Sequence, residues 1–73
     1  MMKYLKQHTR HRWHILIRMH GVILEEFYSN LSERDGYIDT WTIEEYIRRK
    51  YGVTKIITWI RGVSRTIIFD LFL

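Results

Sequence analysis

The absence of cysteine from a chain of only 73 residues restricts how this chain can stabilise a fold. Such a length makes one domain, and it buries only about 60% of the unfolded surface, so the core is marginal. Small domains are usually stabilised further by disulfides, a bound metal or self-association. Disulfides and thiolate metal sites both need cysteine, so self-association is the favoured means here. We therefore expect one domain over residues 1–73 that forms a homodimer, with residues 1–12 as a flexible basic arm.

The apolar content is high enough for a globular core. Hydrophobic residues make up 47% of the chain and aromatic residues 15%, which excludes a disordered protein. No apolar run approaches the roughly 20 residues that span a membrane, and no segment resembles a signal peptide. A cysteine-free chain also suits a reducing compartment. We expect a cytoplasmic protein without a membrane partner.

Charge is divided along the chain into three blocks. Residues 1–24 contain five bases and no acid, residues 25–45 contain seven acids against one base, and residues 46–73 contain six bases against one acid. Segregation of this kind is typical of proteins that bind a polyanion or an acidic partner. Charged faces that pair with one another inside the fold would give the same pattern.

The clearest local signal predicts a helix over residues 43–51. Thr42 is the expected N-cap, and Glu45 three residues later completes a capping box. Apolar side chains recur at helical spacing through this segment. Gly52 stands where a left-handed residue commonly ends a helix.

Elsewhere the apolar patterns fit both helix and strand. Residues 24–31 keep helical spacing, and residues 13–20 can either continue that helix or form a strand that ends at Gly21. Residues 53–73 are rich in β-branched and aromatic side chains, which favour a β-hairpin. Their apolar residues also recur at helical spacing, and short runs do not decide between the two.

The predicted helix, the turn Gly52-Val53-Thr54 and the run that follows resemble a helix-turn-helix over residues 42–65. In that DNA-binding superfamily the first helix ends at a glycine, and the second helix enters the major groove. The resemblance implies a core position for Val53, Ile57 and Ile60. It also implies nucleic-acid contacts from Thr54, Lys55, Thr58, Arg61 and Arg65.

These patterns together predict an α+β fold in a small single domain. One or two helices are expected within residues 13–31, followed by a central capped helix. Residues 53–73 then form either the second helix of a helix-turn-helix-like unit or a C-terminal β-hairpin.

The N-terminal arm interleaves bases with aromatic residues. Lysine and arginine neutralise phosphates, and aromatic rings stack on bases. A solvated terminus anchored by Trp13 would give the same composition. The candidate phosphate-binding residues in this part of the chain are Lys3, Lys6, Arg10, Arg12 and Arg18.

Neither a metal site nor a catalytic site is predicted. The histidines His8, His11, His14 and His20 lack the four-residue spacing at which a helix presents a metal-binding pair. The serines lack the glycine-flanked turn of a nucleophile elbow. We expect no enzyme activity, no metal and no cofactor.

The C-terminal tail is unusually apolar for a chain end. Its residues Asp70-Leu71-Phe72 resemble the end of the peptide by which replication proteins dock on bacterial sliding clamps. Phe69, Leu71 and Phe72 are therefore candidate partner-binding residues. A final core strand and a dimer contact are the alternatives.

The basic arm and the helix-turn-helix resemblance lead to one functional hypothesis. They predict a small nucleic-acid-binding protein that regulates transcription, of the kind that viruses and mobile elements encode, with DNA as the expected partner. The alternative is a protein-interaction module or inhibitor that acts through the acidic residues 25–45 and the apolar tail.

Overall fold

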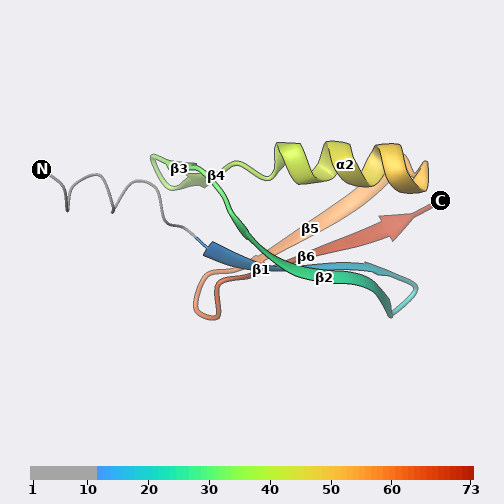
Figure 1. Cartoon of the computed structure of the whole chain (residues 1–73), viewed down its shortest axis with the longest axis horizontal. Helices are drawn as coiled ribbons and strands as arrows, with labels where there is room; N and C mark the ends of the chain where they lie inside the picture. Colours follow the sequence, from blue (N-terminus) through green and yellow to red (C-terminus); the bar gives the residue numbers. More distant parts are fainter. Residues whose placement is uncertain (1–11) are drawn as a thin grey trace, which may run out of the picture.

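The structure, a computed structural model, describes residues 12–73 and is mostly β (Figure 1). In chain order its elements are β1 (Arg12–Met19), β2 (Val22–Asn30), β3 (Glu33–Arg34), β4 (Tyr37–Ile38), α2 (Trp41–Tyr51), β5 (Lys55–Arg61) and β6 (Thr66–Phe72). Four strands form one sheet in the order β2-β1-β6-β5, and β3 pairs with β4 in a separate small hairpin. The helix connects the two edge strands of the sheet.

The sheet combines two antiparallel hairpins joined along a parallel pair. Strands β1 and β6 lie side by side in the same direction at the centre, whereas β2 and β5 run antiparallel to them at the edges. His20 and Gly21 join β1 to β2 with φ angles of 52° and 79°. Positive φ at both residues is the geometry of the two-residue turn that matches strand twist.

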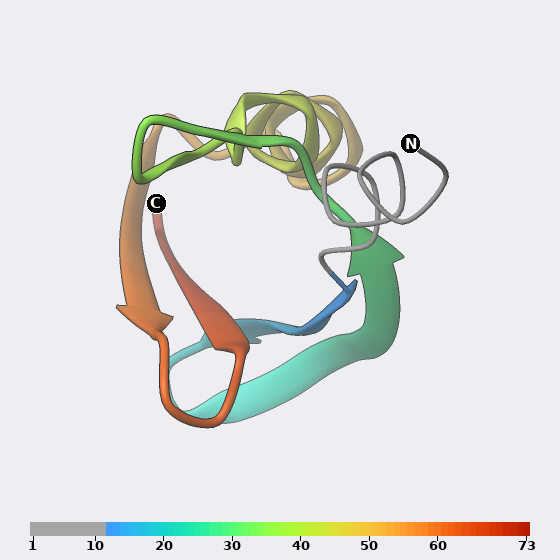
Figure 2. The same ribbon diagram turned by 90° about the vertical axis from the view of Figure 1, so that its left-hand side faces the viewer.

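One face of the sheet carries the core. Alternate residues of the central strands are fully buried: Trp13, Ile15 and Ile17 from β1, and Ile67, Phe69 and Leu71 from β6. The helix adds Ile43 and Ile47 to the same cluster. Seen end-on, the sheet is curled and the helix lies over its open, concave side (Figure 2), so that the core lies between the two.

The predicted helix is confirmed, but its beginning is corrected. The helix starts at Trp41, and Thr40 rather than Thr42 is the N-cap. Asp39 accepts a hydrogen bond from the backbone N–H of Trp41 at 3.1 Å, which satisfies one free donor of the first turn. Gly52 ends the helix in the left-handed conformation at φ 68°, as predicted.

The expected α+β fold class is wrong, because residues 12–73, which the structure describes, are mostly β. No helix forms within residues 13–31, all of which the structure describes; β1 and β2 form a hairpin there instead. The second helix of a helix-turn-helix is also absent, since Lys55–Arg61 is strand β5 and pairs with β6. Four of its seven residues are β-branched, which weakens a helix and suits a pleated sheet. Of the alternatives for residues 53–73, the hairpin is confirmed.

Candidate functional site

The strand residues that alternate with the core form a second surface, which we call the convex face. Strand register sets its side chains in rows across β1, β6 and β5: His14 beside Thr66 and Arg61, Leu16 beside Ile68 and Trp59, and Arg18 beside Asp70 and Ile57. Strand β2 adds Tyr28 beside His14 and Glu26 beside Leu16. The helix lies on the other side of the sheet, so these side chains face away from the core (Figure 2).

Trp59 is held on this face as a flat aromatic platform. The side chain is 48% exposed, and its indole N–H donates to Asp70 at 2.8 Å. Arg18 grips the same carboxylate with two hydrogen bonds, of 2.5 and 2.9 Å. The pKa of Asp70 lies below its ordinary value, mainly because of the hydrogen bonds from Arg18. The charged carboxylate therefore fixes the orientation of the indole ring.

Tyr28 provides a second exposed ring near the opposite edge. It stacks on His14 with ring centres 4.8 Å apart and an angle of 13° between the planes. The guanidinium of Arg12 lies 5.2 Å from the centre of the Tyr28 ring. A ring nitrogen of His14 contacts the Glu26 carboxylate at 2.6 Å. This group combines two stacked rings with a cation beside them.

An aliphatic floor separates the two aromatic positions. Leu16 and Ile68 lie between them on the central strands and are only half-buried. Tyr28 and Trp59 belong to the two edge strands, so three strand spacings, about 14 Å, lie between them across the sheet. The convex face therefore has room for more than one flat apolar group.

The convex face has more positive charge than its own acids neutralise. Glu26 pairs with His14, and Asp70 pairs with Arg18. Among the described residues, Arg12, Lys55 and Arg61 form no ion pair of 4.0 Å or less with an acid. Lys55 instead lies 5.5 Å from the ring centre of Phe72 on the neighbouring strand. Three cations thus surround an apolar and aromatic centre, a composition that suits an anionic ligand with flat rings.

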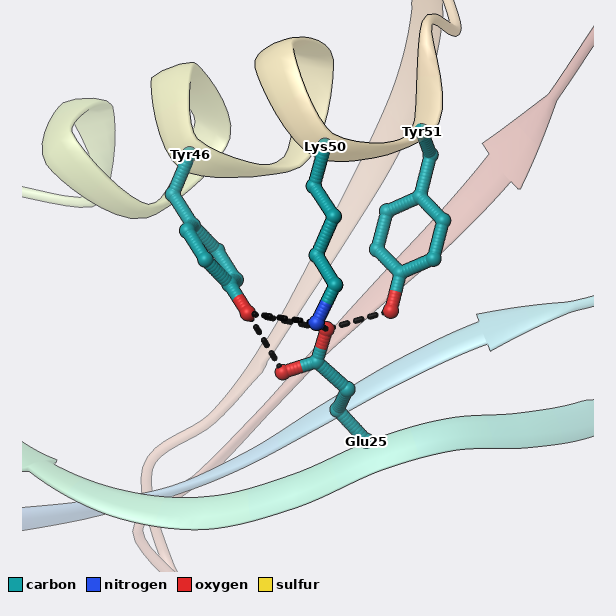
Figure 3. Close-up of polar contacts among 4 residues, drawn as sticks. All are labelled: Glu25, Tyr46, Lys50 and Tyr51. Carbon is teal, nitrogen blue, oxygen red and sulfur yellow. Dashed lines mark hydrogen bonds and ion pairs between the residues drawn. The ribbon is translucent and has the colours of Figure 1, made fainter.

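On the concave side, Glu25 joins β2 to the helix through a saturated polar cluster (Figure 3). Its carboxylate accepts hydrogen bonds from Tyr46 and Tyr51 and lies 3.0 Å from the Nζ atom of Lys50. Burial raises the pKa of Glu25, but the hydrogen bonds from Tyr51, Tyr46 and Lys50 together outweigh it and lower that pKa. A carboxylate held so firmly in its charged form is a weak base. We therefore assign this cluster to stability.

The structure separates the predicted nucleic-acid-binding residues. Arg12, Arg18, Lys55 and Arg61 share the convex face, although Arg18 is committed to Asp70. Thr58 lies on the concave side, where its hydroxyl donates to Glu44 at 3.1 Å. Lys3, Lys6 and Arg10 lie outside the described residues.

Two further predicted contacts, Thr54 and Arg65, lie outside the strands of the sheet. Thr54 is exposed just before β5. Arg65 packs 4.3 Å from the centre of the Trp13 ring and pairs with Glu33 at 3.2 Å. Trp13 itself donates to Glu33 at 3.1 Å, so Arg65 belongs to a structural cluster and serves the fold.

The candidate partner-binding tail is strand β6, at the centre of the sheet. Phe69 and Leu71 are buried in the core, and only Phe72 of the three reaches the surface, on the convex face. The predicted core positions Ile57 and Ile60 are instead exposed on β5. Phe72 points away from Phe69 and Leu71, and Ile57 lies on the convex face, because successive side chains of a strand point to opposite faces. Ile60 faces the concave side and is exposed because β5 is an edge strand.

Trp59 and Tyr28 are the residues of this surface that the sequence patterns did not single out. The available signal for Trp59 was the alternation along Lys55–Arg61, which places Lys55, Ile57, Trp59 and Arg61 on one face of a strand. The equally regular helical spacing of neighbouring apolar residues concealed this alternation.

Comparison of the chain with protein-family models, with curated proteins and with solved structures finds no match. No helix in residues 12–73 is long and apolar enough to cross a membrane. Over the same residues, no group of three or more His, Asp or Glu side chains is placed to hold a metal ion. The surface chemistry of the described residues is therefore the basis for a functional proposal.

Proposed function

We propose that this chain is a small nucleic-acid-binding protein that holds a single strand on the convex face of its sheet. The observation that carries the proposal is the combination of three unpaired cations, Arg12, Lys55 and Arg61, with the exposed rings of Tyr28 and Trp59 on one surface. Cations that follow the phosphates and rings that stack on bases are the two components of single-strand recognition.

A single strand fits this surface better than a duplex. The bases of a duplex are stacked on one another, so exposed rings on a sheet cannot reach their faces. The sheet also offers no helix for the major groove, which is the usual reading element for duplex DNA. Trp59 is held in place by Asp70 before any ligand arrives, which reduces the entropy lost when a base stacks on it.

The curvature of the sheet favours a flexible ligand over a rigid partner. Because the face is convex (Figure 2), two copies placed face to face would touch only along a narrow strip. A single-stranded chain can bend to follow such a surface and keep both rings and phosphates in contact. The N-terminal bases Lys3, Lys6 and Arg10 would add phosphate contacts to this binding mode.

The test compares two tryptophans on opposite sides of the molecule. Trp59→Leu removes the platform of the convex face, and Trp41→Leu removes an indole that is 63% exposed on the helix. Fluorescence polarisation at low salt would measure binding to labelled oligothymidine, oligouridine and duplex DNA of about 12 nucleotides, within the length that one small fold covers. Comparing the two single strands distinguishes DNA from RNA.

We expect both single strands to bind more tightly than the duplex. Trp59→Leu should weaken binding roughly tenfold or more, since stacking on one aromatic side chain contributes about 1–3 kcal/mol. Trp41→Leu should leave the affinity unchanged. No binding at low salt, a preference for the duplex, or equal losses in the two variants would reject the proposal.

A further inference from the structure

The two edge strands of the sheet differ in how well they are protected against pairing. Strand β2 carries a bulge opposite the Ile17/Arg18 step and two carboxylates at its centre, Glu25 and Glu26. Bulges and charges are the features by which natural edge strands avoid pairing. Strand β5 has no bulge in its register with β6 and no charge at its centre. Its two charged residues, Lys55 and Arg61, lie at its ends.

Strand β5 also exposes large apolar side chains on both faces of the sheet. Ile57 and Trp59, on the convex face, are 36% and 48% exposed, and Ile60, on the concave side, is 48% exposed. Ile60 lies opposite Ile67, which is fully buried, so its exposure reflects its place at the edge rather than its face. An added strand beside β5 would shield the outer edge of the side chains on both faces at once.

We propose that the chain forms a symmetric dimer in which β5 pairs antiparallel with β5 of a second copy, with Thr58 on the twofold axis. In this register Ile57 lies opposite Trp59 of the second copy, and Ile56 lies opposite Ile60 of the second copy. Every central side chain except the self-paired Thr58 then meets an apolar partner on its own face, the arrangement that stabilises antiparallel strands. The two sheets become one of eight strands with a continuous convex face.

Other registers of the same pairing are less favourable. A shift of one residue would place convex-face side chains opposite concave-face ones, which the pleat does not allow. A shift that centres Trp59 on the axis would set Ile57 against Arg61 of the second copy and leave Lys55 unpaired. The register centred on Thr58 is therefore the one that pairs all seven residues of the strand.

This register has one unfavourable feature, a repulsion between like charges, which gives the dimer a characteristic dependence on salt. Lys55 lies opposite Arg61 of the second copy at each end of the pairing, and like charges placed opposite each other destabilise a sheet. Added salt screens this repulsion. Dimerisation should therefore become tighter as salt is raised, whereas binding to nucleic acid becomes weaker.

Sedimentation velocity of the full chain over a concentration series, without nucleic acid, tests the dimer. Ile57→Lys combined with Ile60→Lys puts charges on both faces of β5, and Val22→Lys combined with Ile23→Lys does the same on the other edge, at side chains 60% and 53% exposed. We expect the first variant to be monomeric and the second to remain dimeric. Far-ultraviolet circular dichroism would show that both retain the sheet.

Single cysteines provide a second readout, because the natural chain contains none. Thr58→Cys should form a disulfide-linked dimer under mild oxidation, since the two Thr58 positions face each other on the axis. Ile23→Cys, at a more exposed position on β2, should not. A chain that stays monomeric at all concentrations, a dimer that survives lysines on β5, or cross-linking through position 23 rather than 58 would overturn the proposal.

The dimer and the proposed function can fail separately. Ile60→Lys alone changes only the concave side of β5 and leaves the convex face intact. If this variant is monomeric and still binds oligothymidine, the interface is confirmed and binding does not depend on it. A monomeric natural chain that binds oligothymidine would reject the dimer alone.

Discussion

The concave and convex faces are built from the same strands but differ in what covers them. Ile15, Ile17 and Phe69 on the concave face are completely buried beneath the helix. Leu16 and Ile68, their chain neighbours on the convex face, stay half-exposed among cations and aromatic rings. A period of two along each strand therefore separates residues that stabilise the fold from residues that are free to bind a ligand.

The sharpest test of this difference uses adjacent isoleucines of β6. Ile67→Ala removes a fully buried side chain and should reduce the free energy of unfolding by about 2–5 kcal/mol, because it leaves a cavity in the core. Ile68→Ala removes the same atoms from the convex face and should reduce it by about 1 kcal/mol. Urea unfolding of both variants measures the difference. Equal losses would show that the convex face is as closely packed as the core.

Local signals in the sequence were sufficient for the helix and its C-terminal end. Gly52 alone fixes where the helix stops, because only a residue that accepts positive φ can occupy that position easily. The predicted start of the helix, at residue 43, lies two residues after the observed start at Trp41, because both Thr40 and Thr42 are plausible caps. The structure selects Thr40, whose hydroxyl bonds to Glu44, where the sequence had suggested Thr42 and Glu45.

The convex face could not be predicted in the same way, because its parts meet through pairing between distant segments. Arg18 and Asp70 are 52 residues apart in the chain and meet only because β1 and β6 pair in parallel. Alternation along one strand indicates which residues share a face, but it does not indicate which strands are neighbours. Hence the sequence patterns placed Lys55 and Arg61 on a recognition helix, whereas the structure places both on the edge strand β5.

Neighbouring glutamates on β2 provide a second comparison of the faces. Glu25→Gln removes the charge that binds Tyr46, Lys50 and Tyr51 and should reduce the free energy of unfolding at neutral pH by about 1–3 kcal/mol, as expected for hydrogen bonds to a charged group. Glu26→Gln changes a carboxylate on the convex face that is half-exposed and contacts His14, and its effect should stay within about 0.5 kcal/mol. Thermal unfolding of the two variants would rank them.

Acid should reveal the same cluster. The pKa of Glu25 is lower in the fold than its ordinary value, so its stabilising contribution is complete above the unfolded value of about 4 and is lost as pH falls through the lower, folded value. The natural chain should lose stability over this range, and Glu25→Gln should lose less. Part of the dependence should remain, because the pKa of Asp70 is also lowered, chiefly by the hydrogen bond from Arg18. An unchanged acid profile in Glu25→Gln would contradict the assignment of the cluster to stability.

The smallest expected effect concerns the charges, and it separates binding from folding. Lys55→Gln combined with Arg61→Gln removes two unpaired cations from the convex face, whereas Arg48→Gln combined with Arg49→Gln removes two exposed cations from the helix. Each phosphate contact to a single strand contributes about −0.7 to the slope of log affinity against log salt. The first variant should therefore lose roughly 1.4 from that slope by the same rule, and the second should lose none. Both should unfold at nearly the same urea concentration as the natural chain, because exposed charges contribute little to stability, and the pair that Arg49 forms with Glu45 is an exposed one of 4.0 Å. If the helix variant changed the slope instead, the phosphates would lie along the helix, and the concave rather than the convex side of the molecule would be the binding side.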